Sequence, residues 1–282
     1  YYNAFQIAYI NESDLHKPVS WMADACFYQI FVDRFFRGDD AKDDSYINLP
    51  WGEIPNPKSF AGGDLKGIQK KLPYLQDLGI NALYLTPIFK SISNHKYDIQ
   101  DYFTVDAMFG SNADFAGLVA DAHSRKIRVV IDAVFNHVSD QCSQFQDVLK
   151  NGKKSKYFDW FIIHGDTVDQ KEVNYECFSI CNYMPKWNTS NPEVQDFLIS
   201  IAVHWIRQYH IDGWRLDVSD EVSHHFWRRF RQAVKAANPD CAIIGENWHN
   251  ANAYLQGDQY DSIMNYAFTK ACLDFFAFDA LD

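Results

Sequence analysis

Short apolar runs with the character of β-strands alternate with helical patterns along most of this 282-residue chain. The six candidate strands are residues 26–32, 82–86, 128–132, 213–217, 242–246 and 262–265. Such alternation is typical of consecutive βα units that build a parallel sheet. A single α/β barrel commonly has about 250 residues, so we predict one (β/α)8 TIM-type barrel. About six of its eight βα units are found, and we expect the barrel to be incomplete in this chain.

A capped helix and a long connection organise the middle of the chain. Asn191 and Pro192 are typical of a helix N-cap and first turn, and the apolar residues that follow as far as Trp205 fall on one helical face. Residues 115–122 show the same helical spacing. The connection between the third strand and the capped helix, about residues 136–190, is interpreted as an inserted subdomain, because long insertions after a barrel strand are usually functional.

The two ends of the chain suggest a piece of a longer protein. Residues 1–22 lack a clear period, and residues 1–25 are interpreted as a linker from an upstream domain. Residues 26–282 are interpreted as the portion that belongs to the barrel. The chain stops inside an apolar helical pattern that contains Phe275, Phe276 and Phe278. Two more strands would be needed to close a barrel.

Composition narrows the class of partner. The net charge of −11 argues against nucleic acid or an anionic membrane. No run approaches the ~18 apolar residues of a membrane span and no signal peptide opens the chain, so we expect a cytoplasmic protein. The 8 Trp and 16 Tyr exceed what a core requires, and their rings suit the apolar faces of sugars. The six cysteines are expected to be reduced core thiols.

A basic residue and two acids end neighbouring strands. Arg215 and Asp217 project to the same face of their strand, and Glu246 follows 29 residues later at the end of the next one. A fixed cation lowers the pKa of an adjacent carboxyl, whereas repulsion and burial raise that of a second carboxyl across a pocket. This division provides the nucleophile and the proton donor for glycoside cleavage. An ordinary structural ion pair remains the alternative.

Polar clusters recur where four predicted strands end, which is where barrel enzymes carry their reactive groups. They are residues 95–98, 132–137, 213–217 and 245–248. In this order the clusters resemble the α-amylase family of glycoside hydrolases. The sequence YQIF at residues 28–31 opens the barrel as in that family, and MPK at residues 184–186 favours the branch of neopullulanases, cyclomaltodextrinases and maltogenic amylases. Trp187 stands where leucine is usual in that branch.

The resemblance implies a retaining mechanism with Asp217 as nucleophile and Glu246 as general acid/base. It also implies that Arg215 holds Asp217 ionised. Such carboxyls lie about 5–5.5 Å apart, which is too close for an intervening water. A covalent glycosyl-enzyme would therefore form and then be hydrolysed or passed to another sugar.

Further roles follow from the same resemblance. Tyr97 would stack beneath the sugar at the cleavage point, and His137 would hydrogen-bond its hydroxymethyl group. Trp248 would offer a platform on the acceptor side. Asp132 would support the site through hydrogen bonds. For Trp187, stacking on a sugar and plain packing both remain open.

One acid of the family has no counterpart here. The family places a further aspartate in a His-Asp pair after strand seven, and no His-Asp pair occurs in this chain. If 282 residues were the whole molecule, we would expect little or no hydrolysis, because charge stabilisation would be missing and the sheet would be unclosed.

No cofactor is required for this chemistry, although the branch often holds Ca²⁺ in a loop after strand one. The residues that could offer oxygens are Asp39, Asp43, Gly62 and Asp64. Arg37 and Lys42 occupy places where asparagines would be expected, and positive charges oppose a hard cation. We therefore expect Ca²⁺ to bind weakly or not at all, with a lysine or arginine in its place.

The leading hypothesis is an α-glucan hydrolase that acts on maltooligosaccharides, cyclodextrins, starch or pullulan, with transglycosylation. A catalytically silent sugar-binding or transporter-associated barrel is the first alternative, and the intact acids argue against it. A metal-dependent hydrolase that uses His95, His137 and His249 is the second, and these histidines lack the i, i+4 spacing of paired ligands. The resemblance further implies that the longer protein forms a homodimer.

Overall fold

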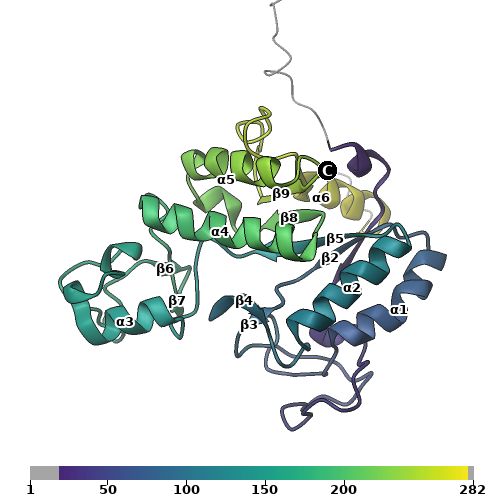
Figure 1. Ribbon diagram of the computed structural model, residues 1–282, viewed down its shortest axis with the longest axis horizontal. Coiled ribbons are helices and arrows are strands. Elements are labelled where there is room, and N and C mark those ends of the chain that lie inside the picture. Colours follow the sequence, from purple (N-terminus) through teal and green to yellow (C-terminus); the bar gives the residue numbers. More distant parts are fainter. Residues whose placement is uncertain (1–18, 279–282) are drawn as a thin grey trace, which may run out of the picture.

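The computed structural model describes residues 19–278. Six strands form one parallel sheet in their order along the chain (Figure 1). They are β1 (Phe27–Ile30), β2 (Ala82–Leu85), β5 (Arg128–Ala133), β8 (Gly213–Leu216), β9 (Ala242–Asn247) and β10 (Ser262–Asn265). Sequential parallel order is what successive βα crossovers produce. The six predicted strands are confirmed, and the sheet is an incomplete TIM-type barrel in which β1 and β10 are the edge strands of the described part.

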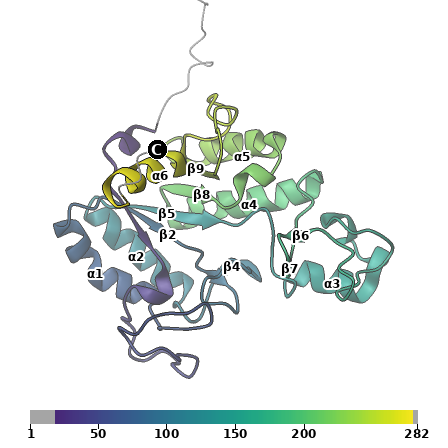
Figure 2. The ribbon, with the colours of Figure 1, turned by 180° about the vertical axis from the view of Figure 1, so that it is seen from behind.

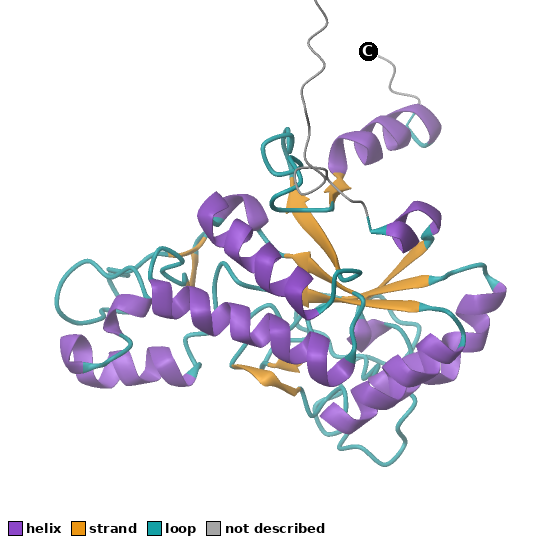
Figure 3. Cartoon of the chain, turned by 45° about the horizontal axis from the view of Figure 1, so that its top comes forward, coloured by secondary structure: helices purple, strands orange, loops and turns teal. Residues whose placement is uncertain are grey.

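Helices flank this sheet (Figure 3). They are α1 (Leu65–Asp77), α2 (Asn112–Ser124), α4 (Pro192–Tyr209) and α5 (His224–Ala237). Helix α6 (Tyr266–Phe276) follows β10 and has no buried residue. Helix α1 packs on α2 and α4 packs on α5, as the view from behind also shows (Figure 2). The side chain of Asn191 accepts the backbone N–H of Glu193 at 2.9 Å, so α4 begins where its cap predicts.

The connection between β5 and α4 forms a lobe that extends away from α1 and α2 (Figure 1). It contains helix α3 (Ser143–Asn151), the 3-10 turns η4 (Gly152–Lys154) and η5 (Phe158–Trp160), and a hairpin of β6 (Cys177–Phe178) and β7 (Cys181–Pro185). Phe145 packs edge-on against Phe161 and Tyr175 at centroid distances of 4.9 and 5.2 Å. The lobe thus has an aromatic core of its own.

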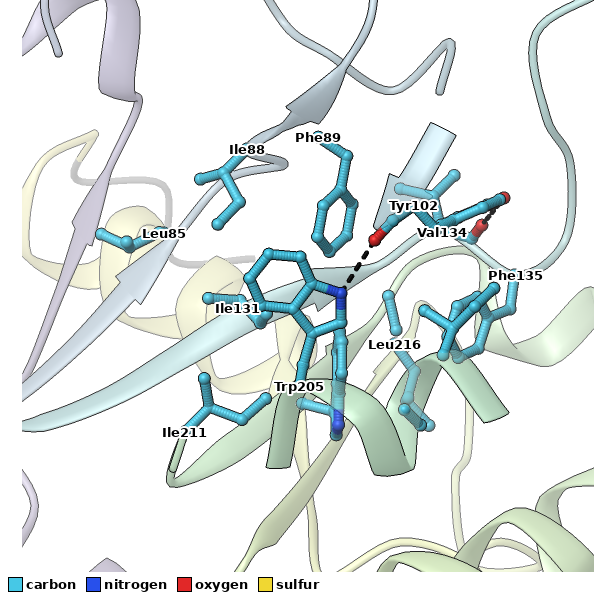
Figure 4. Packing of buried hydrophobic residues seen from close by; sticks show 14 of the residues in the cluster. Leu85, Ile88, Phe89, Tyr102, Ile131, Val134, Phe135, Trp205, Ile211 and Leu216 are labelled. Carbon is cyan, nitrogen blue, oxygen red and sulfur yellow. Dashed lines mark hydrogen bonds between the residues drawn. The ribbon is translucent and has the colours of Figure 1, made fainter. Parts of the chain in front are cut away.

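A second antiparallel pair follows β2 and was not predicted: β3 (Phe89–Lys90) and β4 (Asp101–Val105). It packs on α4 through Trp205, whose ring lies 5.1 Å from that of Phe89 (Figure 4). The indole N–H of Trp205 donates to the carbonyl of Tyr102 at 2.8 Å, and the Tyr102 hydroxyl donates to the carbonyl of Val134 at 2.7 Å. These bonds satisfy polar atoms inside the core and attach α4 to the segment that follows β5.

Two further expectations concern the ends and the cysteines. The predicted linker at residues 1–25 falls mostly outside the described residues, which begin with a 3-10 turn, η2 (Ser20–Asp24). The six cysteines form no disulfide, but only Cys142 and Cys241 are buried, so the prediction of core thiols is wrong for the other four.

Within residues 19–278, no helix is both long and apolar enough to cross a membrane.

Candidate active site

One arginine gathers three carboxylates at the carboxyl edge of the sheet. Asp132 on β5 and Arg215 on β8 are register partners, and Arg215 Nη1 donates to both oxygens of Asp132 at 3.0 and 3.1 Å. The same nitrogen donates to Asp217 Oδ1 at 2.8 Å. Nη2 lies 2.8 Å from Oε2 of Glu246, at the end of β9. The two acids expected to carry the chemistry therefore meet one guanidinium and face the same site.

Burial governs the charges in this cluster. Asp132 is 0% exposed, Asp217 6% and Glu246 9%. Burial raises the pKa of Asp217, Asp132 raises it further, and Arg215 acts in the opposite direction. Burial likewise raises the pKa of Asp132. The net direction for Asp217 is thus opposite to the one predicted, because a single guanidinium is shared among three acids in a dry environment.

Glu246 is held from both sides. Its Oε2 also accepts the backbone N–H of Val218 at 2.9 Å, and its Oε1 accepts the hydroxyl of Tyr266 at 3.0 Å. Tyr266, at the start of α6, was missed by the sequence reasoning. Its ring stacks on Trp248 at 4.1 Å and 5°. Since Trp248 is 62% exposed, it presents an indole at the rim of the site beside Glu246.

Two tyrosines hold Asp132. Tyr84 donates its hydroxyl to Asp132 Oδ2 at 2.5 Å, and Tyr97 donates to the same oxygen at 3.0 Å. Asp132 therefore fixes the position of Tyr97, the expected sugar platform, and has no spare oxygen directed to solvent. Tyr84 was missed, although its place in β2 between two buried leucines is a signal for an inward-facing polar group.

His137 is buried with one nitrogen directed at the site. Its Nε2 lies 3.9 Å from Asp217 Oδ2 and has no hydrogen-bond partner among the residues that the structure describes. Burial lowers the pKa of His137 to about 3, and Lys186 contributes in the same direction. The imidazole is therefore neutral near pH 7. Phe178, from the β6–β7 hairpin, stacks on it at 4.6 Å and 23°, a contact that no sequence pattern indicates.

Trp187 lies in the aromatic core of the lobe. It is 2% exposed and stacks on Phe161 at 4.9 Å. Its indole N–H donates to the hydroxyl of Tyr102 at 3.2 Å. Of the two roles left open for Trp187, these surroundings support packing.

The four residues considered as calcium ligands are only partly brought together. Asp43 Oδ1 accepts the N–H of Ser45 at 3.0 Å and closes its own turn. Asp39 Oδ2 contacts the ammonium of Lys66 at 2.7 Å. The Gly62 carbonyl and Asp64 Oδ2 do converge, but on the ammonium of Lys42 (see below). While the Lys42 ammonium occupies these two oxygens, the cluster does not fit a divalent cation. In the described range, no three His, Cys, Asp or Glu side chains form a metal-binding group.

Barrel enzymes carry their reactive groups at the carboxyl edge of the sheet, and a pair of acids there is the arrangement that glycoside hydrolases use. The "Alpha amylase, catalytic domain" family matches residues 29–281, and the chain belongs to this family of glycoside hydrolases. The resemblance inferred from the ordered motifs is confirmed.

Several similar proteins belong to one branch of this family, that of the cyclomaltodextrinases and maltogenic amylases. A cyclomaltodextrinase of Thermoanaerobacter pseudethanolicus is 50% identical over 279 residues, 98% of this chain and 48% of that protein. The intracellular maltogenic amylase of Bacillus subtilis is 49% identical over 275 residues, 97% of this chain and 46% of that protein. A solved cyclomaltodextrinase structure has a TM-score of 0.92 at 49% identity and covers 97% of this chain and 47% of its own. The chain spans about half the length of these relatives.

Proposed function

We propose that the protein to which this chain belongs is a retaining glycoside hydrolase that cleaves α-glucosidic bonds of maltooligosaccharides, cyclodextrins, starch or pullulan, and transfers part of the released sugar to acceptors. The observation that carries the proposal is the shared guanidinium: Arg215 contacts Asp217 and Glu246 at 2.8 Å each. The names of the cyclomaltodextrinase and maltogenic amylase relatives support this choice of substrates.

The contacts made by each carboxyl oxygen of the two acids suggest their roles. Asp217 Oδ1 is bound by Arg215, which leaves Oδ2, on the side of His137, to attack the anomeric carbon when the carboxyl is in its ionised form. Glu246 Oε2 receives two N–H groups and Oε1 only the Tyr266 hydroxyl, so we assign Oε1 as the oxygen that carries the proton for the departing glycosidic oxygen. In the second half of the reaction, Oε1 removes a proton from water or from a sugar hydroxyl.

Three side chains around the acids are suited to a neutral sugar. His137 is uncharged near pH 7 and offers Nε2 to a hydroxyl group. Tyr97 presents a ring whose hydroxyl is anchored on Asp132. Trp248 offers an exposed indole on the other side of Glu246. Aromatic faces bind the C–H faces of sugars without requiring charge.

The proposal is tested in the full-length protein with maltotriose. Asp217→Asn and Glu246→Gln should each abolish hydrolysis while circular dichroism and melting temperature stay close to those of the unaltered protein. NMR of the early product should show the α-anomer, as retention requires. Near-normal turnover in either variant, or initial β-product, would overturn the mechanism. A barrel that only binds sugars would show binding but no turnover even with both acids intact.

Three further parts of the proposal concern the longer protein. Residues 1–282 by themselves should hydrolyse little, because the described sheet has two unpaired edges. We also propose a homodimer, which light scattering would measure, and a cytoplasmic location, which cell fractionation would test. The name of the similar intracellular maltogenic amylase of Bacillus subtilis supports the cytoplasmic location.

A further inference from the structure

The ammonium group of Lys42 lies at the centre of a cage of oxygens. Nζ is 2.6 Å from the Gly62 carbonyl, 3.0 Å from the Met108 carbonyl and 3.1 Å from Asp64 Oδ2, with the Gly63 carbonyl at 3.5 Å. The side chain of Lys42 is only 7% exposed. We call these four oxygens and the ammonium the Lys42 cage.

The cage joins segments that are distant in sequence. Asp64 is the N-cap of α1, where its Oδ1 accepts the N–H of Gly67 at 2.7 Å and that of Gly38 at 3.0 Å. Asp33, which is buried, accepts the N–H of Gly62 at 3.1 Å. Asp64 and the Gly62 segment are thus held in place by contacts other than those to Lys42. Replacing the ammonium would leave the cage oxygens pointing at one another.

The donor set is one that a hard cation prefers. Three backbone carbonyls and a carboxylate are the kind of oxygen ligands that Ca²⁺ takes in proteins. An ammonium group carries one positive charge and three N–H donors, so it satisfies such oxygens by donating hydrogen bonds to them. Arg37, the other basic residue of this loop, contacts Asp44 at 3.2 Å and does not enter the cage.

We propose that the Lys42 cage is a cation site whose ion is supplied by the chain itself. Lys42 takes the place of a divalent cation, so the loop of residues 37–46 is held to α1 without Ca²⁺. Removing the ammonium opens the site to Ca²⁺. This inference rests on the cage geometry and does not depend on the assignment of the catalytic acids.

The test compares four forms of the full-length protein after treatment with EDTA: unaltered, Lys42→Asn, Lys42→Met and, as the matched control, Lys70→Asn. Lys70 lies in the same region, is exposed and makes one bond, to the Gly38 carbonyl. Melting temperature is measured in EDTA and in millimolar CaCl₂. Calorimetric titration with CaCl₂ measures binding directly, so neither readout requires enzymatic activity.

We expect the melting temperature of the unaltered protein and of Lys70→Asn to be insensitive to EDTA and Ca²⁺. Lys42→Asn should melt lower in EDTA, by on the order of 10 °C, because it loses one partner of a buried charged pair. It should recover at least half of this loss in CaCl₂ and gain one calcium site in the titration. Lys42→Met should show the same loss with little recovery, since a thioether is a poor ligand for a hard cation.

Two results would overturn the inference. One is a calcium ion bound by the unaltered protein that Asp64→Asn abolishes. The other concerns the melting temperature of Lys42→Asn: either it is unchanged in EDTA, or it is lowered in EDTA and does not recover in CaCl₂. If Lys42→Asn cannot be purified, the titration of the unaltered protein and of Asp64→Asn still decides whether the cage takes Ca²⁺.

Discussion

Val218 donates its backbone N–H to Glu246 Oε2 at 2.9 Å while it holds a φ of +47°. A β-branched residue rarely adopts this conformation, which costs on the order of 1–3 kcal/mol. Val218 also directly follows Asp217 in the chain. The strained turn after β8 therefore sets the positions of both candidate catalytic acids.

Relief of this strain should affect turnover more than stability. Val218→Gly permits the same φ without a Cβ but leaves the turn free to adopt others. We expect kcat for maltotriose to fall about tenfold, which corresponds to about 1.4 kcal/mol, while the free energy of unfolding changes by less than about 1 kcal/mol. Val218→Ala is the control that keeps an L-side chain. An unchanged kcat in Val218→Gly would show that the turn does not position Glu246.

The buried imidazole of His137 should make stability depend on pH. Burial lowers its pKa to about 3, whereas the unfolded value is about 6.5. Between these two pH values the unfolded chain binds more protons than the folded protein, so the free energy of unfolding decreases as the pH falls through this window. Above about pH 6.5 this contribution of His137 is absent.

Urea unfolding of His137→Gln and the unaltered protein would measure this contribution. Between about pH 6.5 and pH 5 the unaltered protein should lose up to about 2 kcal/mol more than the variant, since one pKa unit corresponds to about 1.4 kcal/mol. His164→Gln is the control, because the His164 side chain is 67% exposed. Parallel pH profiles for His137→Gln and the unaltered protein would contradict a buried neutral imidazole.

Two tryptophans should respond in opposite ways. Trp187→Leu is expected to lower the free energy of unfolding by about 2–4 kcal/mol and leave KM unchanged, because Trp187 packs inside the lobe. Trp248→Ala should alter stability by less than about 0.5 kcal/mol but raise KM or reduce transfer about tenfold, because it removes the exposed indole that we propose as a sugar platform. A raised KM in Trp187→Leu with unchanged stability would assign the platform role to Trp187 instead.

The local sequence pattern was sufficient to predict the order of the secondary-structure elements and to identify the two candidate catalytic acids. The apolar runs predicted all six sheet strands to within about two residues, and Asn191 with Pro192 predicted the start of α4. These signals are readable because strand alternation and helix capping depend on neighbours in the chain. Asp217 and Glu246 were singled out because each ends such a strand.

Contacts and charges in the site required the tertiary structure. The bond from Tyr84 to Asp132, the stack of Phe178 on His137 and the cage around Lys42 join residues that are 48, 41 and up to 66 positions apart. Their pairing follows from strand register and from how the lobe folds back, which no local pattern encodes. The pKa of Asp217 rises and does not fall because it sums burial, one arginine and two other acids, and only the packed fold sets their distances.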